Sequence, residues 1–320
     1  IKDLPILSPH GHCEPSWFSK NKRFPDPAQL FVVPDHYVFR MLLSQGFTLS
    51  ELGVNSIDGS NFEKDPREIW KKFSENYYLF RGTPTAMWLD YSFEKVFGIT
   101  EPLTPATSDF YYNHIEEKLS QPEYLPQALF DKFNIEVLST TDSAVSELSQ
   151  HIDLKRMNWN GRVIPTYRPD SVIDPESLEF KNDLSKLAEI TDEDTSSWDG
   201  YLKAHKSRRL FFKEMGATAS DHGHASARTE NLSYTEAEQL FERILNEDFN
   251  SEDADKFRGQ MLTEMAKMSC EDGLVMQIHP GSRRIHSNEI LNQFGLDKGF
   301  DIPGRTDYVS ALKPLLDAVG

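Results

Sequence analysis

A repeated local pattern limits the fold more than any other feature of this chain. A short apolar run ends in a cluster of polar residues, and a helical stretch follows. The five runs lie at residues 4–8, 135–139, 162–165, 210–218 and 274–278. Short apolar runs bounded by polar residues are typical of buried strands in parallel sheets. The repetition predicts an α/β fold whose functional side chains follow the C-terminal ends of the strands.

Helical periodicity is clear in three further segments. Asp65-Pro66 is typical of a helix start, and the apolar residues up to Phe80 then fall on one helical face. Residues 233–236 read as a capping box before a second amphipathic helix. A third helix at residues 257–268 carries a methionine-rich stripe. We interpret these methionines as core packing, because helical spacing alone accounts for them.

The spacing of the strands predicts the domain organisation. A β/α crossover needs far fewer residues than those separating the first two runs. We therefore expect a first strand within residues 1–13, an inserted, mainly helical subdomain at 14–132, and the remaining strands, two to five, within 133–320.

Charge and composition narrow the class of partner. Lys and Arg total 34 and Asp and Glu total 51, so the net charge is 34 − 51 = −17. Such a surface repels nucleic acid and anionic membranes, so we expect neither as a partner. The two cysteines do not form a disulfide framework, and no signal segment or membrane-length apolar run is present in the sequence. We expect a cytoplasmic protein, whose oligomeric state stays open, a homo-oligomer included.

His10-Gly11-His12 is the clearest candidate metal motif. Residues i and i+2 of an extended strand point to the same side, so both imidazoles could bind one cation. Imidazole suits zinc and similar divalent metals. The alternative is two hydrogen-bonded histidines at a polar strand end.

Polar residues after later strands could share that site. Asp221-His222-Gly223-His224 follows the fourth run and His279 follows the fifth. An aspartate and histidines at this spacing could act as ligand, base or hydrogen-bond partner, or form an ordinary polar turn. Histidine at three separate strand ends favours one shared site.

Arginines and one phenol complete the candidate set. Arg168 follows the third run and Arg284 lies shortly after His279. A guanidinium matches a carboxylate bidentately, although a structural ion pair would place arginine there equally well. Tyr37 and His36 stand in the first turn of a predicted helix capped by Asp35. They could transfer protons, or Tyr37 could be a packed aromatic.

Together these segments resemble the uronate isomerase (glucuronate isomerase) family of the amidohydrolase superfamily. The motifs that carry the resemblance are Pro9-His10-Gly11-His12, the sequence from Pro34 to Arg40, the sequence from Leu79 to Pro84, the sequence from Thr166 to Asp170, the sequence from Gly216 to His224, and the sequence from Gln277 to Gly281. They run along essentially the whole chain.

The resemblance implies a distorted, metal-dependent (β/α)8 barrel that interconverts D-glucuronate with D-fructuronate and D-galacturonate with D-tagaturonate. It implies that His10 and His12 hold the metal, usually zinc. Arg168, His279 and Arg284 would bind the hexuronate, while Tyr37, His36 and Asp221 would assist proton movement.

Family members are longer than this sequence, so we expect the C-terminal barrel strands and their acidic ligand to be absent from it. Two alternatives remain open. One is a metal-dependent hydrolase of the same superfamily, and the other is a non-catalytic fragment that binds sugar acids.

Overall fold

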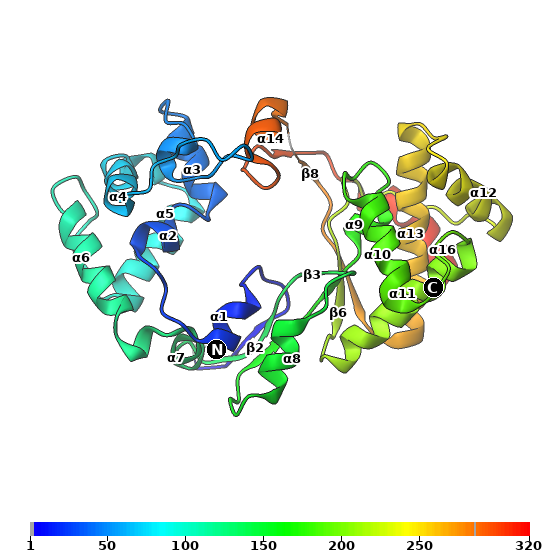
Figure 1. Cartoon of the computed structure of the whole chain (residues 1–320), viewed down its shortest axis with the longest axis horizontal. Helices are drawn as coiled ribbons and strands as arrows, with labels where there is room; N and C mark the ends of the chain where they lie inside the picture. The colour runs from blue at the N-terminus through cyan, green and yellow to red at the C-terminus, as the bar shows by residue number, and fades with distance from the viewer. Residues whose placement is uncertain (1–2, 285) are drawn as a thin grey trace. The chain divides into compact units, whose positions relative to one another are not determined.

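The computed structural model describes residues 3–284 and 286–320, which form two compact units. The first, called here the strand unit, takes its described residues from Ile1–Lys20, Phe130–Ser282 and Pro303–Gly320. The second, called the helical unit, comprises described residues of Asn21–Leu129 and Arg283–Ile302. Each unit is considered by itself (Figure 1).

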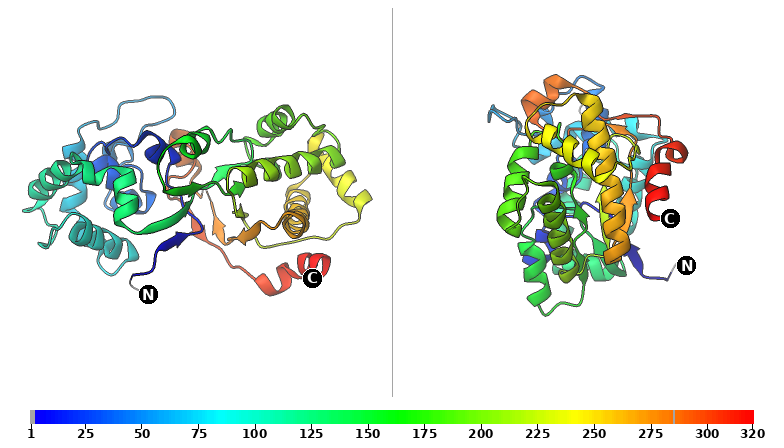
Figure 2. Two further views of the ribbon diagram at one scale, coloured as in Figure 1. Left: turned by 90° about the horizontal axis from the view of Figure 1, so that it is seen from below. Right: turned by 90° about the vertical axis from the view of Figure 1, so that its right-hand side faces the viewer.

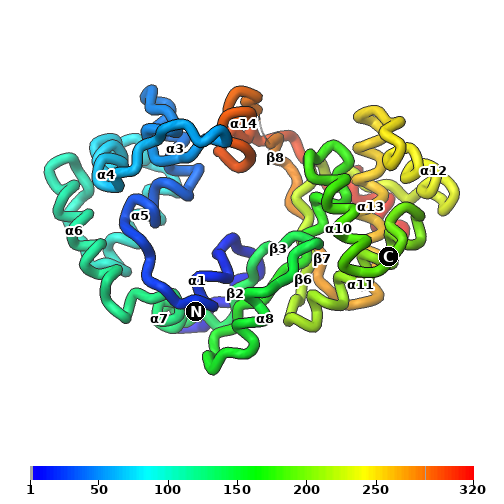
Figure 3. The backbone as a smooth tube through the Cα atoms, viewed as in Figure 1, coloured from blue at the N-terminus to red at the C-terminus, as the bar shows by residue number. Residues whose placement is uncertain are grey.

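Parallel strands form the centre of the strand unit. They are β1 (Ile6–Ser8), β2 (Ile135–Ser139), β3 (Asp142–Ser143), β4 (Arg162–Ile164), β5 (Tyr167–Arg168), β6 (Ala219–His222) and β7 (Val275–Ile278). The strand orders are β1-β2-β4 and β3-β5-β6-β7, with every pairing parallel. Because β3 closely follows β2 and β5 closely follows β4, neighbouring strands succeed one another in chain order (Figure 3). The predicted α/β fold with parallel strands is confirmed.

Four of the five predicted strand runs contain a strand, and the run at 210–218 was wrong. Its first residues belong to helix α11 (Trp198–Glu214), and the strand that follows is β6. Tyr201, Ala204 and Phe212 are buried at helical spacing, so the apolar residues near 210 end an amphipathic helix. A short apolar run cannot be assigned to a strand by periodicity alone. The Asp221 motif therefore lies within and directly after the strand.

Helices of the strand unit pack beside one another and cover its core (Figure 2). They are α1 (Pro15–Lys20), α8 (Ser149–Arg156), α9 (Asp170–Ile173), α10 (Phe180–Thr191), α11, α12 (Tyr234–Leu245), α13 (Ser251–Asp272), α15 (Tyr308–Ala311) and α16 (Lys313–Val319), with α7 (Pro126–Lys132) at a unit boundary. The predicted capping box at Ser233 and Glu236 is confirmed. Met261, Met265 and Met268 are buried in the core, as predicted.

The helical unit has its own aromatic core. Its helices are α2 (Pro27–Phe31), α3 (His36–Leu43), α4 (Pro66–Glu75), α5 (Pro84–Tyr91), α6 (Ser108–Leu119) and α14 (Asn288–Phe294). Asp35 and Asp65 cap α3 and α4, as expected. The helix predicted to reach Phe80 instead ends at Glu75, and a 3₁₀ turn at Tyr77–Phe80 continues the buried face.

Short strands β8 (Ser282–Arg283) and β9 (Ile302–Pro303) form a separate two-stranded sheet. Among the described residues, no helix combines the length and the apolar character that a membrane crossing requires.

His205 is a buried histidine of the strand-unit core. Its Nδ1 lies 2.7 Å from the hydroxyl of Tyr167, and its Nε2 has no hydrogen-bond partner among the described residues. Burial, with a smaller contribution from the Arg209 guanidinium, lowers the pKa of His205 to about 3. The folded chain therefore keeps this ring neutral over the range in which an unfolded chain protonates it.

We expect His205 to make folding acid-sensitive. An unfolded histidine titrates near pH 6.5, so its stabilising contribution is complete above that pH and is lost as the pH falls toward 3. The loss is about 1.4 kcal/mol per pH unit below the unfolded pKa. Urea denaturation of the parent and of His205→Gln at pH 7, 6 and 5 measures it. Between pH 7 and pH 5 the unfolding free energy of the variant should depend on pH less steeply than that of the parent, by about one bound proton. If the two free energies change with pH in parallel, His205 is not the group responsible.

Candidate functional site

The strand ends of β6 and β7, with the segment after β1, place three predicted residues together. β6 pairs with β7 in parallel register, Asp221 opposite Gln277 and His222 opposite Ile278. The amide of His279 then donates to the carbonyl of His222 at 3.1 Å, which extends the pairing by one residue. His279 is thereby fixed at the C-terminal end of the sheet, where ligand sites of parallel α/β folds lie.

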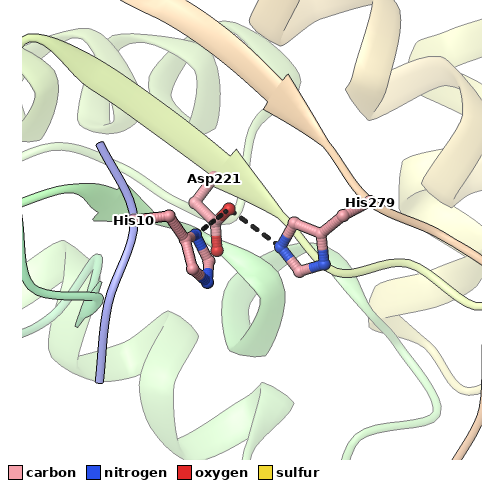
Figure 4. A group of neighbouring side chains, drawn as sticks. All are labelled: His10, Asp221 and His279. Carbon is pink, nitrogen blue, oxygen red and sulfur yellow. Dashed lines mark ion pairs between the residues drawn. The ribbon is translucent and has the colours of Figure 1, made fainter. Parts of the chain in front are cut away.

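Asp221 is the centre of this group. Its Oδ1 lies 3.2 Å from Nδ1 of His10 and 2.8 Å from Nε2 of His279 (Figure 4). Its Oδ2 lies 3.5 Å from Nη1 of Arg168. The carboxylate is fully buried, whereas the His10 and His279 side chains are 32% and 38% exposed. The two imidazoles are therefore the part of the group that solutes can reach.

Opposing effects act on the acidity of Asp221. Burial alone would raise its pKa, but the close contact with His279 and the positive charges of His279, Arg168 and His10 outweigh burial. The net result is a pKa below the usual value for aspartate. The group therefore presents an ionised carboxylate between nitrogen donors.

The group fits a divalent cation. His10, Asp221 and His279 each offer one donor atom, and these atoms lie within 4.8 Å of one another. Both Asp221 oxygens are buried, yet within the described part of the chain neither accepts a well-aligned hydrogen bond. Buried carboxylate oxygens normally have such partners, so their absence fits a site built for an ion. Imidazole and carboxylate together suit zinc and similar metals.

His12, the second predicted ligand, adjoins this group. Its Nε2 lies 3.2 Å from Nε2 of His10, and the two rings meet edge to face with centroids 5.0 Å apart. The structure thus brings both histidines of the motif to one place, with His10 in contact with the carboxylate.

Two side chains without a predicted role hold the backbone of the His10-Gly11-His12 motif. Thr141 Oγ1 donates to the Gly11 carbonyl at 2.7 Å, and Gln277 Nε2 donates to the Pro9 carbonyl at 2.9 Å. A Cβ on Gly11 would lie 3.1 Å from the carbonyl oxygen of Ser139, so a larger residue would crowd the neighbouring strand end. Both residues stand near strand ends, and Gln277 also opens one of the sequence motifs named above, but nothing in the sequence pointed to these contacts.

Arg168 bridges two carboxylates. Its Nε lies 2.8 Å from Asp170 Oδ2, and its Nη1 faces Asp221. The side chain is 20% exposed, so part of the guanidinium stays accessible. Asp170 appeared in the sequence motif without a role, and the structure shows that it orients Arg168.

Gly223 leaves the space that the Arg168 guanidinium fills. A Cβ at this position would lie 2.3 Å from Arg168 Nη2, 2.9 Å from Asp170 Oδ2 and 3.2 Å from His279 Cε1. A methyl group would therefore displace the arginine and press on His279. The backbone of Gly223 is not left-handed, so alanine adds no conformational strain.

We predict that Gly223→Ala impairs the site more than the fold. Because the clash falls on the movable end of Arg168, stability should fall by about 1 kcal/mol, the lower end of what overpacking costs. Activity of the site should fall about tenfold or more, since misplacing one contact by an ångström costs up to about a hundredfold. Steady-state kinetics and urea denaturation measure the two effects. Gly304→Ala is a matched control, because its Cβ would meet no atom closer than 3.6 Å. Equal activity losses in both variants would contradict the prediction.

The remaining predicted residues belong to the helical unit. In α3 the rings of His36 and Tyr37 lie 4.4 Å apart, and the Arg40 guanidinium carbon lies 5.0 Å from the Tyr37 ring centre. The Tyr37 side chain is exposed rather than packed in the core. Arg284 lies 3.4 Å from Asp297 in an exposed ion pair.

Parallel β/α units with imidazoles and a carboxylate at the strand ends are typical of α/β enzymes, whose sites lie at the C-terminal ends of the strands. Residues 1–320 match the model of the family described as glucuronate isomerase. A uronate isomerase of Rhizobium meliloti is 58% identical over 320 residues, which are 100% of this chain and 68% of the relative. One of Mesorhizobium japonicum is 56% identical with the same coverage. The chain belongs to the glucuronate isomerase family.

Solved structures agree with this assignment. The crystal structure of glucuronate isomerase from Caulobacter crescentus matches with a TM-score of 0.97 and 51% identity, over 100% of this chain and 67% of that one. The uronate isomerase of Thermotoga maritima matches with a TM-score of 0.90 and 28% identity, over 99% of this chain and 68% of that one. The fold of the present chain is thus that of about two-thirds of each relative.

Proposed function

We propose that the chain carries the isomerase activity of its family, interconverting D-glucuronate with D-fructuronate and D-galacturonate with D-tagaturonate. The observation that carries the proposal is the ionised, buried Asp221 between His10, His279 and Arg168 at the strand ends. In this reaction the proton on C2 of the aldose leaves and a proton arrives at C1, while the hydroxyl proton on O2 is exchanged for one on O1. The intermediate is an enediolate.

We propose that His10 and His12 hold a divalent metal, zinc by our prediction, with Asp221 and His279 beside them. When bound, such a cation supplies positive charge that stabilises developing negative charge on the sugar oxygens. Replacing His10 or His12 by Ala should lower the bound metal per chain; an unchanged stoichiometry would reject ligation.

The side chains have separate proposed tasks. The accessible part of the Arg168 guanidinium suits the substrate carboxylate, and Arg284 is a second candidate for it. His279 is exposed enough to contact sugar hydroxyls, while Asp221 holds its ring in place. His36 and Tyr37 remain our candidates for moving the proton between C2 and C1. Variants of these two residues test that assignment in the assay below.

We propose that the parallel strands belong to a distorted (β/α)8 barrel. This extends the observed chain-order succession of strands, which is the order that such barrels use. In this proposal residues 1–13 supply the first strand, 14–132 the helical insertion and 133–320 the following strands.

Proton exchange provides a direct test of function. The protein is incubated with D-glucuronate or D-galacturonate and zinc in D₂O, and nuclear magnetic resonance follows both the C2 proton and the keto product. An isomerase that passes the proton through an exchangeable group forms the ketose with deuterium on C1, and the reverse reaction places deuterium on C2 of the remaining aldose. Bound uronate with neither change would instead support a sugar-acid-binding protein. In a parallel incubation with an amide or ester substrate, cleavage would support a hydrolase. His10→Ala is the matched control.

A further inference from the structure

A second group of potential metal ligands lies next to the first but faces away from it. His222 is the last residue of β6, His224 follows two residues later, and Asp170 begins α9. We propose that Asp170, His222 and His224 form a second divalent-cation site, distinct from the site at His10. The proposal concerns these donors alone and does not depend on isomerase activity.

The three donors converge. Each offers one ligand atom, and these atoms lie within 4.8 Å of one another. His222 is fully buried and His224 is 7% exposed, so their imidazoles are held within the strand unit. Asp170 is partly open, with 28% of its side chain exposed, which gives an ion access from one side.

Unpartnered nitrogens in this group point to a missing ligand. Nδ1 of His222 and Nε2 of His224 are buried, and neither has a hydrogen-bond partner among residues 3–284 and 286–320. Buried polar atoms are nearly always paired, and two unpaired imidazole nitrogens beside one carboxylate are explained by a shared cation. His222 Nε2 lies 3.1 Å from Ser220 Oγ, so its second nitrogen has the kind of partner that orients a metal-binding ring.

Strand geometry separates the two sites. Successive side chains of a strand point to opposite faces, so Asp221 and His222 lie on different sides of β6. Asp221 faces His10 and His279, whereas Ser220 and His222 share the other side. The donor atoms accordingly form two separate sets, each with its atoms within 4.8 Å of one another.

Asp170 is already positioned for ligation. Its carboxylate receives Arg168 Nε at 2.8 Å and the amide of Gly223 at 3.2 and 3.3 Å. Two carboxylate oxygens offer about four acceptor directions, so these contacts orient the group and leave capacity for an ion. An ion here would tie the segment after β6 to the first turn of α9, where Asp170 also holds Arg168.

The donor set selects a class of cation. Two imidazoles and one carboxylate suit zinc, cobalt or nickel, whereas magnesium and calcium prefer oxygen ligands throughout. Three protein donors also leave room for a water molecule, as in zinc sites that are not closed.

Metal stoichiometry tests the proposal without using activity. The metal-free full chain is titrated with Zn²⁺, and bound metal is counted by atomic absorption after desalting. We expect two equivalents in the parent and one in His224→Gln, with the same loss in Asp170→Asn. His10→Ala should lose the other equivalent, and the His10→Ala, His224→Gln double variant should lose both.

Controls keep the test decisive. His205 also has a buried, unpartnered Nε2 but belongs to neither donor group, so His205→Gln should retain both equivalents. Asp170 is the more exposed ligand, so its variant remains informative if His224→Gln does not fold. The proposal is overturned if folded Asp170→Asn and His224→Gln bind as much Zn²⁺, as tightly, as the parent.

Discussion

Asp221→Asn should lower uronate turnover by about a thousandfold or more while leaving the protein folded. The substitution keeps the shape of the side chain and removes its charge, on which His10, His279 and Arg168 all converge. In serine proteases, replacing the carboxylate that orients the catalytic histidine by a neutral amide lowers the rate by about 10⁴-fold. Bound metal at the proposed His10 site should fall as well, because the Asp221 carboxylate, a potential metal ligand, loses its negative charge. Steady-state kinetics and metal analysis on the same sample measure both effects.

Asp142→Asn is the matched control for that experiment. Asp142 is also a poorly exposed aspartate beside a strand end, but it receives the hydroxyl of Thr140 at 2.7 Å and lies 3.9 Å from His151. It belongs to neither group of potential metal ligands. Its variant should keep activity within a few-fold of the parent. Near-normal turnover in Asp221→Asn, or equal losses in both variants, would remove Asp221 from the proposed mechanism.

The parts of the site that could be predicted are those encoded within one segment. His10-Gly11-His12 showed alternation directly in the sequence, and Asp221 and His279 stood at the ends of apolar runs. Asp221 and His279 lie together because the neighbouring parallel strands β6 and β7 end at one edge. Local pattern and sheet geometry sufficed for these two residues. His10 follows β1 of the other sheet, and only the structure shows that it reaches Asp221.

Residues that act through pairing across the sheet could not be predicted in this way. Thr141 and Gln277 hold the backbone of the His10-Gly11-His12 motif across 130 and 268 residues of sequence, and no local pattern predicts such a contact. Asp170 likewise depends on where Gly223 and Arg168 meet. The wrong strand prediction at 210–218 has a different cause. The apolar residues at the start of this run end the amphipathic helix α11, and the sequence does not show which elements that helix packs against.

Asp272→Asn should be the most destabilising single substitution proposed here, at about 3–5 kcal/mol. Asp272 accepts Arg209 Nε at 2.6 Å and Nη2 at 3.0 Å, and it also receives the amide of Leu274 at 2.9 Å. It thus joins α11 to the end of α13 just before β7 begins. The Arg209 side chain is only 1% exposed, so a neutral partner would leave a buried, unpaired guanidinium. Urea denaturation at pH 7 measures the loss of unfolding free energy.

Arg209→Met should cost less than Asp272→Asn, because the two partners differ in exposure. Asp272 is 23% exposed and lies near Lys213, so the carboxylate left behind can be hydrated and partly neutralised. The buried Arg209 guanidinium would be neither hydrated nor neutralised by a neighbouring charge. The double variant Arg209→Met, Asp272→Leu removes both charges and should be more stable than Asp272→Asn alone, since replacing a whole buried pair by apolar groups is often nearly neutral. If Arg209→Met is the more destabilising single variant, packing of the arginine stem among Met265 and its neighbours, rather than pairing of charge, dominates this contact.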